Sequence, residues 1–164
     1  MGDGVSQTTV MWSQNLAGDM RQLLRRDRLT LICGARPDAE RVVHDLGRLL
    51  GVTPASVSVC ALSPSVAATP ERLTERLVGN SLLFDVEALC WKPWMNLAPV
   101  RFLRSLARES GVVAVWPGEV EQETVKFSTP GRRDHVRENA RGITVLRSRP
   151  TSFPDQVPFT MEGH

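Results

Sequence analysis

Short apolar runs alternate with helix-like segments along most of this chain, and that alternation restricts the fold more than any other feature. The apolar runs lie at residues 29–33, 57–62, 81–84, 112–116 and 143–146. They lack the alternation of polar and apolar residues that is typical of a sheet with one solvent-exposed face. We therefore expect strands that are buried on both sides. Strands that alternate with helices form a parallel sheet covered on both faces. The pattern therefore predicts an α/β three-layer sandwich with a mostly parallel sheet of about five strands.

Apolar residues at helical spacing occupy the intervals between these runs. We expect helices over residues 10–24, 39–50, 71–78 and 97–109. Gly51 is a typical helix stop, and Thr69 followed by Pro70 is a typical helix start. A further short β segment is expected near residues 125–127. We expect residues 1–9 to be a flexible N-terminus and residues 148–164 a C-terminal tail, which leaves 10–147 as the domain.

Composition excludes several classes of protein. A chain of 164 residues is long enough for one domain with its own core. No apolar run approaches the ~20 residues of a membrane span, and the N-terminus lacks the pattern of a signal peptide, so we expect a cytoplasmic protein. The three cysteines include no CxxC pair, which disfavours a zinc ribbon or a disulfide framework.

The segment between the first strand and its helix has the position and length of a phosphate-binding P-loop. That loop follows the pattern GxxxxGK[ST], in which backbone N–H groups and a lysine hold phosphates. Only its first glycine is present here, as Gly34. Ala39 replaces the second glycine, Glu40 the lysine and Arg41 the Mg²⁺-binding hydroxyl. The pattern thus indicates a degenerate nucleotide loop, or alternatively an ordinary strand-to-helix connection.

The substitutions in this loop oppose phosphate binding. Pro37 has no N–H to donate, and Glu40 places a negative charge where ATP requires a positive one. Two unit charges ~4 Å apart interact by about 4 kcal/mol at an effective dielectric of ~20, so this exchange alone would abolish micromolar affinity. Arg36 and Arg41 are the residues that could compensate, because guanidinium groups bind phosphate well.

Two later strands end in residues that bear on the same chemistry. Asp85 follows the apolar run 81–84, as does the Mg²⁺-holding aspartate of P-loop ATPases, and Glu87 is expected on the same side of the chain. The strand at 112–116 corresponds to the one that senses the γ-phosphate, yet it ends in Trp116. Asp85 and Glu87 are therefore remnants of a catalytic pair, or simply polar residues at a strand end.

These features predict a P-loop NTPase-like fold of the AAA+/ASCE type, and the stretch 82–146 resembles one family in particular. It is similar to the small P-loop protein of BREX phage-defence systems (BrxF). The matching segments are residues 85–89, the helix at 97–108 with Pro99, the Trp-Pro-Gly of 116–118, and the Pro-Gly-containing segment 127–135. Residues 29–50 match the family's P-loop region. Members usually keep an intact GxxxxGK[ST], from which this chain departs at three positions.

The resemblance implies an accessory or regulatory subunit of a BREX-type defence complex that has lost ATP hydrolysis. Its implied partners are the large ATPase, the methyltransferase and the phosphatase-like protein of such systems. No cofactor is expected. The main alternative is a weak ATPase in which ATP and Mg²⁺ bind through Arg36, Arg41 and Asp85. A fragment of a clamp-loader-like AAA+ protein is a further alternative, although the chain lacks room for a helical lid domain.

Arginine and tryptophan residues outside the loop suggest additional contacts. Arginines on one face of the helix at 97–109, together with a second group further on, would suit DNA or a protein partner. Two tryptophans in an expected loop would suit a protein interface. These candidates are Arg101, Arg104, Arg108, Arg132, Arg133, Trp91 and Trp94.

Overall fold

The computed structural model describes residues 6–8, 21–58, 70–90, 98–128, 131–132, 135–148 and 159–163. Its strands are β1 (Ser6–Thr8), β2 (Leu29–Cys33), β3 (Ala55–Ser56), β4 (Leu82–Phe84), β5 (Val112–Val115), β6 (Glu119–Glu121), β7 (Thr124–Phe127), β8 (Val136–Asn139), β9 (Thr144–Ser148) and β10 (Phe159–Gly163). Its helices are α2 (Arg36–Leu50), α4 (Pro70–Leu77), the 3₁₀ helix η1 (Val86–Leu89) and α5 (Pro99–Ala107).

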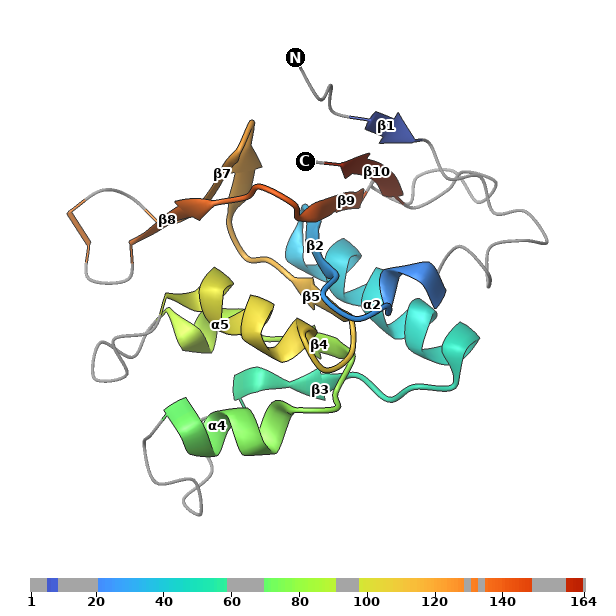
Figure 1. The fold of residues 1–164 in the computed structure, drawn as a ribbon. Coiled ribbons are helices and arrows are strands. Elements are labelled where there is room, and N and C mark those ends of the chain that lie inside the picture. Colours follow the sequence, from blue (N-terminus) through green and yellow to red (C-terminus); the bar gives the residue numbers. More distant parts are fainter. Residues whose placement is uncertain are drawn as a thin grey trace.

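A seven-stranded sheet forms the centre of the fold, in the order β1-β10-β9-β2-β5-β4-β3 (Figure 1). The five strands from β9 to β3 pair in parallel, whereas β10 and β1 continue the sheet in antiparallel fashion. Counted along the chain, the parallel strands lie side by side in the order fifth, first, fourth, third, second. This arrangement confirms the predicted α/β fold with a mostly parallel sheet of five strands.

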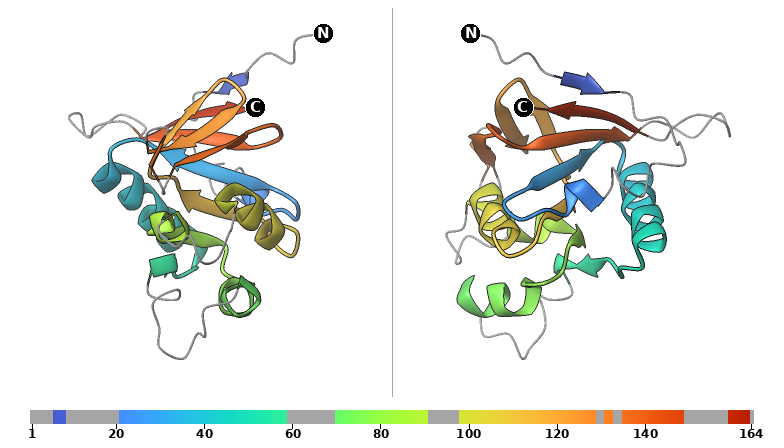
Figure 2. Two further views of the ribbon diagram at one scale, coloured as in Figure 1. Left: turned by 90° about the vertical axis from the view of Figure 1, so that its left-hand side faces the viewer. Right: turned by 45° about the vertical axis from the view of Figure 1, so that its right-hand side comes forward.

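Helices cover both faces of the parallel strands (Figure 2). On one face α2 packs through Ala39, Val42, Val43 and Leu46 against a core that includes Ile32 of β2 and Val113 of β5. On the other face α4, η1 and α5 contribute to a larger core with the alternate residues of the same strands. Both central strands are buried along their whole length, as expected for parallel strands between two helical layers.

A small antiparallel sheet, β6-β7-β8, connects β5 to β9 in the place where the other crossovers use a helix. Trp116 anchors this sheet to the central strands. Its backbone N–H donates to the Ile32 carbonyl at 2.8 Å, and its indole Nε1 donates to the Lys126 carbonyl at 2.9 Å. The ring is fully buried and meets Phe127 edge-on. Trp116 therefore fills the space between the two sheets.

The same sheet is also joined to α5. The Glu138 carboxylate accepts hydrogen bonds from the backbone N–H groups of Val100 and Arg101, at 2.9 and 3.1 Å. Ala98 at the start of α5 makes no side-chain cap of its own, so Glu138 satisfies N–H groups that a helix leaves unpaired at its first turn. The Arg104 guanidinium in turn donates to the carbonyls of Asn139 and Arg141. The helix and the small sheet thus support one another.

Both expected chain ends differ from the prediction. Residues 1–9 were expected to be flexible and 148–164 to be a tail, yet β1 and β10 add two strands to the sheet. Strand β10 pairs with β9 over five residues, from Phe159 with Ser148 to Gly163 with Thr144. These two strands were not expected, since backbone pairing does not require the apolar runs by which the other strands were recognised.

Other boundaries shift by smaller amounts. The second strand was expected at residues 57–62, but β3 is Ala55–Ser56, and residues 57 and 58 are helical, while 59–62 lie outside the described residues. Of the helix expected at 10–24, only 21–23 are described as helical. The strand expected near 125–127 is confirmed as β7, and helices α4 and α5 lie within two residues of their expected positions.

In the part of the chain that the structure describes, every helix is too short or too polar to cross a membrane.

The Glu138 contact can be tested by substitution. Glu138→Gln keeps one acceptor oxygen but removes the negative charge that favours a helix N-terminus, so we expect a loss of about 1 kcal/mol in the free energy of unfolding. Urea denaturation measures it. Glu123→Gln, at an exposed position, is the matched control and should change stability by less than about 0.5 kcal/mol. Equal losses in both variants would contradict the capping role.

Candidate functional site

The site residues predicted from the sequence gather at the carboxyl ends of β2, β4 and β5. In parallel sheets this edge is where ligands usually bind. Gly34 follows β2, Asp85 follows β4, and Trp116 follows β5. The N-terminus of α2 starts directly beyond β2, so its first turn faces the residues that follow the other two strands.

The connection between β2 and α2 is shorter than predicted. Only Gly34 and Ala35 separate the two elements, because α2 begins at Arg36 and not at residue 39. Pro37 lies in the first turn, where a missing N–H has no cost, and the negative charge of Asp38 favours the positive end of the helix dipole. The prediction of a five-residue loop at residues 34–38 was wrong because residues 36–38 suit the first turn of a helix as well as they suit a loop.

Gly34 has a packing role that requires no phosphate. Its φ of 138° is a conformation that side-chain-bearing residues rarely adopt. A Cβ added there would lie 2.0 Å from the Oγ of Ser148 on β9, and that hydroxyl donates to the Cys33 carbonyl at 3.1 Å. The glycine that resembled the first residue of a P-loop is thus also needed because the neighbouring strand passes close by.

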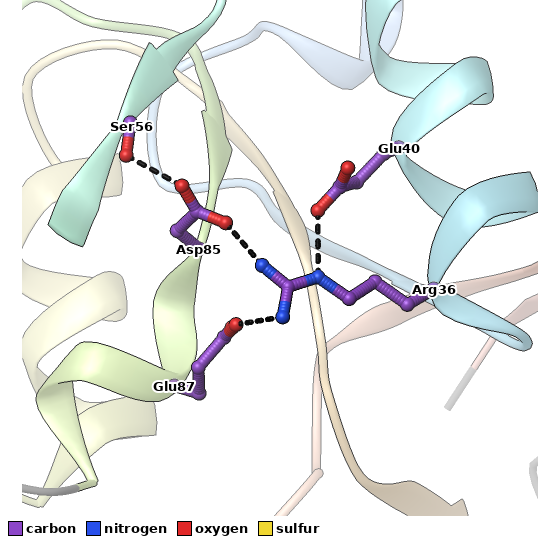
Figure 3. A network of polar contacts seen from close by, with 5 residues as sticks. All are labelled: Arg36, Glu40, Ser56, Asp85 and Glu87. Carbon is purple, nitrogen blue, oxygen red and sulfur yellow. Dashed lines mark hydrogen bonds and ion pairs between the residues drawn. The ribbon is translucent and has the colours of Figure 1, made fainter. Parts of the chain in front are cut away.

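Arg36 is the centre of the site (Figure 3). Its Nε donates to Oε1 of Glu40 at 2.9 Å, one turn along α2. Its other two nitrogens reach across to the end of β4, one to Oδ1 of Asp85 at 2.6 Å and one to Oε1 of Glu87 at 2.8 Å. One guanidinium therefore holds three carboxylates that come from α2, from the end of β4 and from η1.

Asp85 and Glu87 lie on the same side of the chain, as the sequence predicted, but for a different reason. The chain does not continue as an extended strand. Asp85 has φ 56° and ψ 37°, in the left-handed region that aspartate tolerates better than most residues, and η1 follows at once. The second oxygen of Asp85 accepts a hydrogen bond from Ser56 on β3 at 2.6 Å. Asp85 thus connects the end of β4 with α2 and with β3.

Burial and charge differ among the members of this cluster. The Glu87 side chain is only 10% exposed, whereas that of Arg36 is 61% exposed and covers the carboxylates from the solvent side. The pKa of Arg36 is raised, first by its hydrogen bond to Glu40 and then by the charge of Glu87. The raised pKa of Arg36 contributes to the free energy of unfolding at every pH below the ordinary arginine pKa. This contribution is lost only as the pH rises above that value. The guanidinium therefore stays charged throughout the physiological range.

A pocket of about 270 Å³ lies beside this cluster. Its polar side is formed by Arg36, Glu40 and Glu87, and its apolar side by residues that follow β5 and end β7. The complete lining is Gly34, Arg36, Glu40, Glu87, Val115, Trp116, Pro117 and Phe127. A larger cleft of about 680 Å³ shares Gly34, Pro117 and Phe127 and continues toward Lys126 and Arg147.

Several residues that form this site were missed in the sequence. Ser56 fell outside the predicted second strand, although a hydroxyl at the carboxyl end of a strand is a general sign of a site. Phe127 ends β7 of the small sheet, which was predicted only as a single short strand, and Pro117 lies in the connection that leads from β5 into that sheet. Their contribution depends on how β7 folds back over β5, and the sequence carries no local pattern for that packing.

The remaining sequence candidates do not join the cluster. Arg41 lies 3.7 Å from Asp38 on its own helix. Arg104 donates to the carbonyls described above, while Arg101 and Arg108 are exposed on α5. Arg132 is exposed as well. Trp91, Trp94 and Arg133 lie outside the described residues.

Within the described ranges, no group of three or more His, Cys, Asp and Glu side chains is arranged to hold a metal ion. Comparison of the chain with profiles of protein families, with curated proteins and with solved structures gives no match.

The arginine cluster predicts a difference between two arginines of α2. Arg36→Ala leaves the mostly buried Glu87 without its ion-pair partner, so we expect a loss of about 1–2 kcal/mol in the free energy of unfolding. Arg41→Ala, at an exposed position on the same helix, should cost less than about 0.5 kcal/mol. Urea denaturation of both variants at pH 7 is the measurement. A loss in Arg36→Ala no larger than in Arg41→Ala would show that the cluster contributes nothing to stability.

Proposed function

We propose that this chain is an accessory subunit on a P-loop NTPase-like fold that acts without binding nucleotide. The order of its five parallel strands supports the assignment of the fold. In the ASCE division of P-loop ATPases, one strand lies between the phosphate-loop strand and the strand that ends in the acidic pair. Here β5 lies between β2 and β4 in the same way.

One observation carries the proposal. In an active site of this class, the triphosphate and Mg²⁺ lie between the first turn of the helix and the acidic strand end. In this chain the guanidinium of Arg36 lies between the same two elements and pairs with Asp85 and Glu87. Ion pairs within the chain thus occupy the place where Mg²⁺ and the triphosphate would balance one another's charges.

The residues present do not fit Mg²⁺-ATP. The two-residue connection offers no nest of consecutive N–H groups, and Asp85 already accepts hydrogen bonds from Arg36 and Ser56. A phosphate ~4 Å from Glu40 or Glu87 would be opposed by about 4 kcal/mol per charge pair, which is roughly a thousandfold in affinity.

The weak-ATPase alternative has less support. It needs Arg36 to take over the role of the missing lysine, yet Arg36 is held by three carboxylates of its own chain. Turning it toward a phosphate would leave Glu87 mostly buried and unpaired. Arg41 lies one turn further along α2 and near Asp38. DNA contact through the exposed Arg101 and Arg108 stays a prediction.

A subunit of this kind acts through its protein contacts. The resemblance to the small P-loop protein of BREX systems motivates the choice of partners, namely the large ATPase, the methyltransferase and the phosphatase-like protein of such a system. The proposed role is that of an assembly or regulatory subunit whose rigid sheet edge is presented to one of them.

Nucleotide titration tests this function. We expect no binding heat with ATP or ADP and Mg²⁺ up to about 1 mM, and an unchanged Tm in their presence. A ligand at a hundred times its Kd would stabilise the fold by about 2.7 kcal/mol, so the Tm measurement detects even weak binding. Micromolar binding that Asp85→Asn weakens would overturn the proposal.

A second experiment tests the accessory role itself. The tagged chain is co-expressed with each of the three BREX-type partners in turn, and complexes are sought by affinity purification and size-exclusion chromatography. We expect one stable complex that forms equally well with and without ATP. Failure with all three partners would refute the BREX assignment.

A further inference from the structure

We propose that the pocket beside Arg36 receives a cationic side chain, above all arginine, from a partner protein. This inference rests on the proposed function and adds the chemistry by which the partner is recognised. Its basis is the combination of a small cavity, an excess of negative charge and an apolar wall at one place in the fold. Figure 3 shows the three carboxylates around Arg36.

The cluster is not neutralised within the described residues. Glu40, Asp85 and Glu87 carry three negative charges, and Arg36 carries the single positive charge among them. Each carboxylate uses only one oxygen for Arg36. The second oxygen of Asp85 accepts from Ser56, whereas Oε2 of Glu40 and Oε2 of Glu87 have no partner among the described residues.

Glu87 is the most buried of the three carboxylates. Its side chain is nine-tenths buried, and it lines the pocket. A carboxylate can accept about four hydrogen bonds, and Oε2 of Glu87 is not among the fully buried unpaired side-chain atoms of the described residues, so a donor can reach it from the pocket. A donor that enters the pocket would therefore satisfy an oxygen that the chain itself leaves available, and Glu40 faces the same space from α2.

The opposite wall suits a flat cation. Phe127 and Pro117 form the accessible apolar surface there, with the fully buried Trp116 as its support. A guanidinium stacks on aromatic rings through its plane while its N–H groups donate sideways to carboxylates. Lysine would gain the charge interaction without the stacking. The wall therefore favours arginine over lysine.

Size and charge exclude other occupants. A volume of about 270 Å³ is suited to one long side chain. An anion would meet Glu40 and Glu87 at close range, and a purely apolar group would offer no donor to the oxygens that Arg36 does not use. Arg36 remains in place, because the incoming cation uses the oxygens that Arg36 does not.

The test uses N-methylguanidinium as the probe, titrated to about 20 mM into the ¹⁵N-labelled full chain and followed by NMR. We expect saturable shifts of the Gly34 and Phe127 amides and of the Trp116 indole N–H. Sodium chloride at equal ionic strength should not cause them. Glu40→Gln and Glu87→Gln should each weaken binding by about tenfold, the effect of losing one charge-assisted hydrogen bond. Glu71→Gln, exposed on α4 and outside this pocket, is the matched control.

Further variants make the result specific. Phe127→Leu keeps an apolar wall but removes the ring, so it should weaken N-methylguanidinium binding more than methylammonium binding. Should Glu87→Gln fail to fold, Glu40→Gln decides alone, because Glu40 is less buried. Absence of saturable shifts in the native chain overturns the inference, as do shifts that survive Glu40→Gln unchanged.

This experiment separates the two proposals. Tight nucleotide binding would refute the proposed function whatever the probe does. A chain that binds neither nucleotide nor N-methylguanidinium would retain the accessory role and lose only the arginine pocket.

Discussion

Burial of β2 and β5 on both faces is the constraint on which the rest of the structure depends. Two cores meet on these strands, one with α2 and one with α4 and α5, so a charged side chain on either strand would be buried without solvent. The one polar residue of these two strands is Thr30, whose fully buried hydroxyl has no partner among the described residues. Charged side chains are found at the strand ends instead. The carboxyl edge is where the helix start, the acidic strand end and the small sheet converge, which is why the charged cluster forms there.

Arg36 then decides what that edge can do. A helix that starts two residues after its strand brings its first turn close to the neighbouring strand ends. With Arg36 in that turn, the positive charge that holds the three carboxylates comes from the chain itself. The cluster is therefore assembled before anything binds to it.

The sequence predicted much of the fold because β2, β5 and the helices rely on apolar spacing, which is a local property. It also brought Asp85, Glu87, Arg36 and Glu40 to one edge, since the ends of parallel strands share that edge. The start of α2 was misplaced because Pro37 and Asp38 suit both a loop and a first turn. Strands β1 and β10 were missed because backbone pairing needs no local apolar run. Ser56, Pro117 and Phe127 depend on packing between segments that are distant in the chain.

Helix α5 receives its N-terminal cap from a residue 38 positions later in the chain. During synthesis the helix would leave the ribosome well before Glu138 does, and its first turn would have no carboxylate to accept its N–H groups. The small sheet must form before that partner is in position. Completion of the second helical layer is therefore coupled to the last third of the chain, as is completion of the sheet, because β2 also waits for its neighbour β9.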